Sequence, residues 1–353
     1  MKMKKIFAAV CFACLAATAF AVDSDELQKA KDGLSNKLCS ATEDILAGFE
    51  KLLPEANSLS GVQPDAYIGK LFPSVPPHFA AGINASVTPV KADFVFDNMK
   101  VISSAVSDML KDVDAIGGVG DFDFGLDFPN TIPYPAASVN ARVGGLFLPF
   151  DIGVWAVTTG NVFHNKSIGN SPTFDFDYTC VGADLRYAVL EGNLILPKIS
   201  VGAGYQWVHQ NIGVSFDKDF TSSFKYNGED YTGKGSLDAA FNMKLDTHTF
   251  FGQIQVSKTI LILTPYVGLK ALFTTSNCDY DWNYETQVEG SKVDLLSASK
   301  SNSYKHTISE NGIQTQIFGG LGLNFLLFQT TFNAAYNFSS NQFTGSLGFN
   351  VKL

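Results

Sequence analysis

The sequence predicts a transmembrane antiparallel β-barrel of about ten strands, preceded by an N-terminal helical segment. Apolar and polar side chains alternate along ten segments, and each reaches the roughly 9–11 residues that a tilted strand needs to cross a bilayer. The links between these segments alternate between short and long, as in a barrel with turns at one membrane face and loops at the other. No apolar run approaches the roughly 20 residues of a membrane helix.

The first segment, residues 1–21, has the features of a cleaved secretory signal. Three lysines precede an apolar stretch at 6–20, and residues 19–21 (Ala-Phe-Ala) form a small-x-small cleavage site. We therefore expect an exported mature chain that begins at Val22. Lipidation of Cys14 is an alternative, although the residues before it match a lipobox poorly.

Composition narrows the class of exported protein. The chain contains 30 Phe, 12 Tyr and 31 Gly, which suits strands with lipid-facing aromatic residues and a crowded lumen. The formal net charge of −9 argues against nucleic-acid binding. Three cysteines remain after signal cleavage, Cys39, Cys180 and Cys278, and an odd number cannot form a complete disulfide framework. A bridge between Cys180 and Cys278 is compatible with the sequence but has no local support.

Residues 22–78 are expected to form a helical segment followed by a Pro-rich linker. Apolar residues recur at helical spacing from Ser24 to Leu53, and residues 40–43 (Ser-Ala-Thr-Glu) have the spacing of a capping box. Five prolines between Pro54 and Pro77 then favour an extended chain. The segment is interpreted as a periplasmic peg or a plug in the lumen, with a partner-binding helix as the alternative.

Residues 79–353 are assigned to the barrel. The predicted strands are 79–88, 136–147, 150–160, 172–190, 198–217, 246–258, 264–284, 312–325, 328–338 and 342–353. Long polar links are expected at 161–171, 218–245 and 285–311; further strands in the last two would raise the count to twelve or fourteen. Phe174, Phe176 and Tyr178 lie on the parity that faces inward after Cys180, so either a bulge lies near Thr179 or these aromatic residues rise above the membrane.

Residues 89–135 are predicted to form a helical insertion between the first two strands. Apolar residues from Met99 to Leu110 follow helical spacing, and a Gly pair at 117–118 ends the pattern. The insertion could constrict the barrel mouth. The alternating aspartates of 121–127 permit a calcium site, but the phenylalanines between them favour a strand or hairpin.

Parity along the strands predicts which polar side chains face the lumen. If Val139, Ala141 and Val143 face lipid, Asn140 and Arg142 face inward. The same rule gives the lumen set Asn84, Arg142, Asp184, Arg186, Gln206, Gln253, Gln255, Lys270, Gln314, Gln316 and Asn333. This set has three cationic members and one acidic member, so we expect a mildly cationic lumen that attracts anionic solutes or a fatty-acid carboxylate. The alternative is that these side chains bond to one another and fill a narrow barrel.

The last strand resembles the C-terminal recognition signal of bacterial outer-membrane barrel proteins. Ser346, Gly348, Val351 and Leu353 supply its polar, glycine and two apolar positions. The resemblance implies a location in the cell outer membrane, contact with its lipid, and insertion by the barrel-assembly machinery. It also implies a periplasmic C-terminus, which places the long links outside and the N-terminal helices in the periplasm or the lumen.

Two function classes remain for the whole chain. Its layout of N-terminal helices before a barrel is similar to the long-chain fatty-acid transporter family, which implies transport of a hydrophobic solute. We expect a porin-like or hydrophobic-solute channel; the alternative is a non-conducting structural or surface-interaction barrel whose external loops bind a partner. The five histidines show no metal-ligand spacing and no nucleophile–base arrangement, so no catalytic residue, metal or cofactor is predicted.

Overall fold

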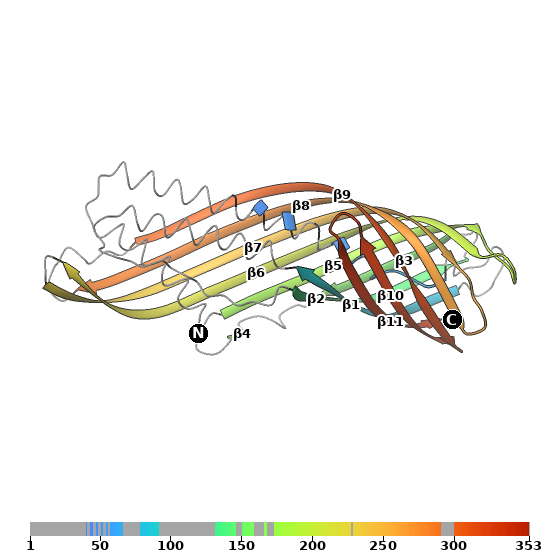
Figure 1. Ribbon diagram of the computed structural model, residues 1–353, viewed down its shortest axis with the longest axis horizontal. Coiled ribbons are helices and arrows are strands. Elements are labelled where there is room, and N and C mark those ends of the chain that lie inside the picture. The colour runs from blue at the N-terminus through green and yellow to red at the C-terminus, as the bar shows by residue number, and fades with distance from the viewer. Residues whose placement is uncertain are drawn as a thin grey trace.

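A computed structural model describes residues 40, 43–44, 47–48, 51, 54–55, 57–65, 78–91, 131–145, 150–158, 166–167, 173–226, 229–290 and 300–352 (Figure 1). The strands are β1 (His78–Lys91), β2 (Thr131–Gly144), β3 (Phe150–Thr158), β4 (Lys166–Ser167), β5 (Thr173–Leu190), β6 (Lys198–Tyr226), β7 (Glu229–Ser257), β8 (Leu263–Gly290), β9 (Lys300–Phe325), β10 (Phe328–Asn337) and β11 (Gln342–Lys352). The predicted signal peptide, 1–21, lies outside the described residues.

Ten of these strands form a closed antiparallel barrel, which confirms the predicted fold class. Neighbouring strands follow the order β3-β2-β1-β11-β10-β9-β8-β7-β6-β5, and pairing of β3 with β5 closes the ring. The first and last strands pair directly, with Ala80 opposite Lys352. The two-residue β4 pairs only with the start of β5. Closure satisfies the backbone donors and acceptors that an open edge would expose to lipid.

Four strands are longer than predicted. β6 and β7 each contain 29 residues and pair continuously until Tyr226 meets Glu229. The predicted links at 218–245 and 285–311 are therefore wrong: the first is strand apart from 227–228, and β8 and β9 leave only 291–299 undescribed. Much of the sequence there has polar residues at both parities, which weakens the alternation but not the backbone pairing, because ladder hydrogen bonds do not depend on side-chain type.

Both ends of the predicted insertion at 89–135 belong to strands in the structure, so the insertion is shorter than predicted. β1 continues to Lys91 and β2 begins at Thr131, where Thr131 pairs with Lys91. The helical and calcium interpretations fall on 92–130, which lie outside the described residues.

The barrel has two distinct ends. The links 191–197, 258–262 and 326–327 lie at one end together with the end of β11, and we call this the turn end. The link 338–341 and the projecting parts of β5 to β9 lie at the other, which we call the extended end. Figure 1 shows the long ribbons of β6 to β9 running far beyond the short strands that surround the C-terminus.

Burial alternates along the strands and separates an inner from an outer face. In β10, Gln329, Thr331 and Asn333 are buried, whereas Phe328 and Phe332 are exposed. The exposed apolar residues of the outer face include Ile83, Val139, Val154, Val181, Leu269, Ile313, Leu347 and Phe349. Such a continuous apolar belt is far larger than the patches of soluble monomers and is typical of a surface that faces lipid.

The aromatic parity break on β5 has a simple explanation. The register between β5 and β6 is continuous from Thr173 to Ala188, and its one shift lies between Ala188 and Leu190. A bulge near Thr179 is therefore wrong. Tyr178 is 5% exposed and belongs to an apolar cluster of the barrel interior.

Candidate functional site: a lumen crossed by the N-terminal segment

The barrel lumen contains a segment of the chain that precedes β1. We call residues 54–55 and 57–65 the plug segment. Its side chains are deeply buried, with Glu55 and Leu59 at 0% exposure and Gln63 at 1%. Barrel residues from both halves of the chain contact it, since Gln63 Nε2 donates to Asn140 Oδ1 at 3.1 Å and to Asn350 Oδ1 at 3.2 Å.

The plug segment crosses the closed barrel from end to end. At the extended end, Ser340 Oγ donates to Glu55 Oε2 at 2.7 Å. At the turn end, Lys198 and Lys352 form ion pairs with Asp65 at 3.2 and 3.1 Å. The segment therefore runs parallel to the barrel axis, with Glu55 and Asp65 marking its two ends.

The backbone of the plug segment is a series of tight turns. Ser58 N donates to the carbonyl of Glu55, and Ser60 and Val62 each repeat this spacing of three residues. Short turns of this kind leave many carbonyl groups without an intrasegment donor, and a buried unpaired carbonyl costs about 1–3 kcal/mol. The wall of the barrel must therefore supply donors.

Polar side chains of the inner wall supply these donors. Asn84 donates to the carbonyl of Leu59 at 2.6 Å, Lys270 to that of Ser58 at 2.7 Å, and Arg142 to that of Gly61 at 3.1 Å. Further donors to plug carbonyls are Ser138 to Ser60, Gln255 to Gln63 and Pro64, and Arg186 to Asp65. These contacts reach main-chain atoms, so they do not depend on the side chains of the plug segment.

Two arginines and two aspartates form a buried ionic network beneath the plug segment. Arg142 bridges Asp151 at 2.6 Å and Asp184 at 2.5 Å, and Arg186 bridges Asp151 at 2.6 Å. Charges taken out of water are stable only when paired in this way. The two guanidinium charges of the lumen are thus matched by two carboxylates, which leaves less free positive charge than the sequence predicted.

Lys270 is held differently. Its Nζ lies 4.6 Å from the ring centroid of Phe251 and 5.4 Å from that of Phe318. Among the described residues it forms no ion pair, and its hydrogen bond goes to the carbonyl of Ser58 in the plug segment. Lys270 is therefore a buried cation whose partner belongs to the segment that fills the lumen.

The structure places every predicted lumen residue on the inner parity. Asn84, Arg142, Asp184, Arg186, Gln206, Gln255, Lys270, Gln314, Gln316 and Asn333 are buried, and Gln253 is half-buried. Gln316 contacts the plug segment through Ser58, whereas Gln206 accepts a hydrogen bond from Trp155. In the C-terminal signal, Ser346 and Gly348 face inward and Val351 outward, while Leu353 lies outside the described residues.

Sequence reasoning missed two features of the lumen. One is Asp151, at the start of the predicted strand 150–160. Its neighbour Ile152 faces outward, so the alternation along the strand would have placed Asp151 inside. The other is an apolar cluster that includes Trp155, Val208, Leu245 and Phe251. Cys180 and Cys278 belong to this cluster as buried free thiols, so the disulfide between them is not formed.

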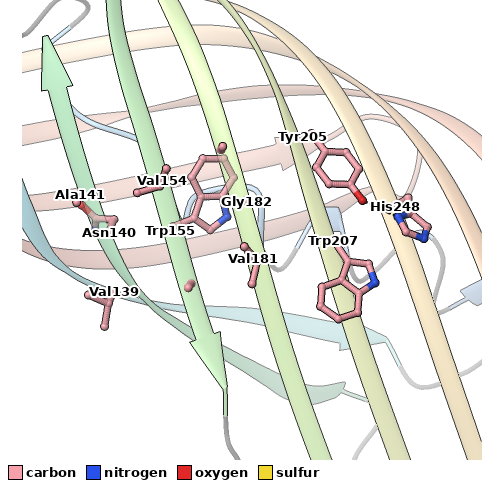
Figure 2. A pocket seen from close by; sticks show the side chains of 12 residues that line it. Val139, Asn140, Ala141, Val154, Trp155, Val181, Gly182, Tyr205, Trp207 and His248 are labelled. Atoms are coloured by element: carbon pink, nitrogen blue, oxygen red, sulfur yellow. Dashed lines mark hydrogen bonds between the residues drawn. The ribbon is translucent and has the colours of Figure 1, made fainter.

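A separate groove of about 650 Å³ lies on the outer face of the barrel (Figure 2). It is formed over β2, β3, β5, β6 and β7 by outward residues such as Val139, Val181 and Tyr205. The groove belongs to the apolar belt and does not connect Lys270 or the plug segment with the surface.

No protein-family model and no curated protein matches the sequence. Solved structures with a similar fold include the toluene transporter TbuX of Ralstonia pickettii, at 11% identity and TM-score 0.24 over 78% of this chain and 89% of that chain. The translocator domain of autotransporter NalP from Neisseria meningitidis gives 9% identity and TM-score 0.29 over 89% and 96%. The attachment protein Ail of Yersinia pestis gives 8% identity and TM-score 0.20 over 78% and 99%. Such general likeness says nothing about solute or partner.

Proposed function

We propose that the protein is an outer-membrane β-barrel channel that its plug segment gates. The outer-membrane location is supported by the apolar belt around a closed barrel and by the C-terminal signal that ends in Val351 and Leu353. Bilayer lipid and the barrel-assembly machinery are then its first partners. The proposal assigns no catalytic role to any residue.

The observation that carries the gating proposal is that the lumen is wide enough to contain a second polypeptide segment. Without residues 54–65, the inner wall would enclose a path lined by polar groups such as Asn84, Gln255 and Gln316. Each hydrogen bond that holds the segment contributes only about 0.5–1.5 kcal/mol to the stability of the closed state, because water can replace it. The polar contacts are therefore replaceable, whereas Leu59 and Val62 pack in an apolar cluster with Tyr266 and Phe318 that displacement would open.

An amphipathic anion, such as a fatty acid, is the solute class we propose. Arg142 and Arg186 are neutralised by carboxylates, whereas Lys270 loses its carbonyl acceptor when Ser58 moves away. Phe251 joins Lys270 to the apolar cluster of the inner wall. A carboxylate at Lys270 with its hydrocarbon chain along this cluster would meet both charge and apolar surface.

Planar-bilayer conductance of the refolded protein tests the gate. We expect little conductance from the mature chain and ion conductance after deletion of residues 22–65. A matched variant, Glu55→Cys with Ser340→Cys, keeps all other residues. When a short, reducible bifunctional thiol reagent joins the two cysteines, it should lose the few openings of the mature chain and regain them when the link is reduced. Absence of conductance from the deleted chain, in the folded state shown by its heat-modifiable gel mobility, would contradict the proposal.

A surface-interaction barrel is the second candidate function. It is favoured by β6 to β9, which contain 26–29 residues although about 9–11 suffice to cross a bilayer. The surplus forms a sheet that projects at the extended end. Removal of the projecting hairpin should abolish binding of a partner and leave conductance unchanged if this candidate is correct.

A further inference from the structure

The direction of the plug segment determines where the beginning of the mature chain lies. Asp65 is at the turn end, where it contacts Lys198, Lys352 and Thr259. β1 begins at the same end, because His78 pairs with Gly144 at the end of β2. The chain between Asp65 and His78 therefore starts and finishes at the turn end.

The chain upstream of the plug segment is at the opposite end. Glu55 contacts Ser340, which lies in the link between β10 and β11 at the extended end. The chain is continuous, so the described positions before 54 connect to the plug segment at that end. Figure 1 draws short blue pieces of the N-terminal chain near the labels of β8 and β9, away from the C-terminus.

We infer that the barrel threads its own chain through its lumen and presents the positions upstream of the plug segment, from Ser40 to Lys51, at the extended end. With a C-terminus on the periplasmic side, this is the external face. The inference differs from the sequence-based expectation that the N-terminal helices remain in the periplasm or lumen. It does not depend on gating, because a permanently closed barrel would thread its chain in the same way.

The threaded arrangement places exposed polar positions of the upstream chain beyond the extended end of the lumen. Ser40, Glu43, Asp44 and Lys51 are exposed helical positions upstream of the lumen. They stand on the same side of the membrane as the projecting parts of β6 to β9.

Membrane-impermeant thiol labelling of whole cells that express the full chain tests this topology. The reporter is Ser40→Cys in a Cys39→Ser background, in which Cys180 and Cys278 stay buried and unreactive. Ser339→Cys, exposed in the link 338–341, reports the extended end, and Leu194→Cys, 95% exposed in the link 191–197, reports the turn end.

The expected result is that Ser40→Cys follows Ser339→Cys: both are labelled on intact cells, and Leu194→Cys is labelled only after permeabilisation. The comparison between the three positions is valid whichever end of the barrel faces outside. The inference is overturned if Ser40→Cys follows Leu194→Cys, or if it stays unreactive on both sides while the two end reporters react. A failed conductance test would leave this labelling pattern unchanged.

Discussion

At the scale of single residues, Asp151 is the acceptor on which the buried network depends. It pairs with both Arg142 and Arg186 through side chains that are at most 2% exposed. Asp151→Ala would leave Arg186 with no carboxylate partner in the part of the chain that the structure describes, and should lower the free energy of unfolding by about 3–5 kcal/mol. Urea titration of the protein in lipid vesicles measures this change.

The outward neighbour supplies a matched control for Asp151. Ile152→Val removes one methylene from the lipid-facing side of the same strand and should cost about 1 kcal/mol or less. An equal decrease in the free energy of unfolding for Asp151→Ala and Ile152→Val would mean that the ionic network does not stabilise the barrel.

Gly182 makes room for an aromatic ring inside the barrel. A Cβ atom at this position would overlap the indole of Trp155, whereas a Cβ at Gly345 would have no atom within 4 Å. We expect Gly182→Ala to destabilise the protein by about 1–3 kcal/mol and to shift the tryptophan emission, because Trp155 must leave its site. Gly345→Ala should change neither quantity. A silent Gly182→Ala would show that the ring lies elsewhere.

The inward or outward direction of most side chains could be predicted from sequence, but their partners could not. Parity placed Arg142 and Asp184 inside, because the apolar face of a strand points to lipid and the opposite face must then point to the lumen. The contact of Lys270 with Ser58 joins residues 212 positions apart and involves a main-chain oxygen. No sequence pattern encodes such a contact, since every residue has that oxygen.

At the scale of elements, the projecting hairpin of β6 and β7 extends beyond the closed barrel and pairs there with β8. Asp217 pairs with Asp238 near the middle of the hairpin. In the shortened protein, residues 217–238 are removed and an Asn-Gly turn joins Phe216 to Ala239. All β6–β7 pairs from there to the turn end then stay in register. The shortened protein should therefore fold and keep its heat-modifiable mobility on gels. Loss of folding would show that the projecting strands help to build the barrel.

The sequence located strand ends better at one end of the barrel than at the other. At the turn end, the short links between lipid-facing strands interrupt the alternation, so 326–327 was predicted correctly. At the extended end the strands leave the apolar belt before they finish, and alternation fades while backbone pairing continues. The bounds of β6 to β9 were therefore underestimated.

At the scale of the whole molecule, barrel closure followed from the sequence, but the route of the N-terminal segment did not. Ten alternating strands with an apolar outer face have no stable open form in a bilayer. By contrast, the turn residues Asn57, Ser58 and Ser60 suit an exposed linker as well as a plug. Their choice between these states depends on donors that converge from several strands of the barrel wall.

Cross-linking at both ends of the lumen tests most directly whether the chain crosses its own barrel. In native membranes, a short bifunctional thiol reagent should join Glu55→Cys to Ser340→Cys and Asp65→Cys to Lys352→Cys within single chains, as efficiently as the wall pair Ser86→Cys and Ser346→Cys, which are opposite in register. Linkage of the wall pair without linkage at either end of the plug segment would contradict a threaded lumen.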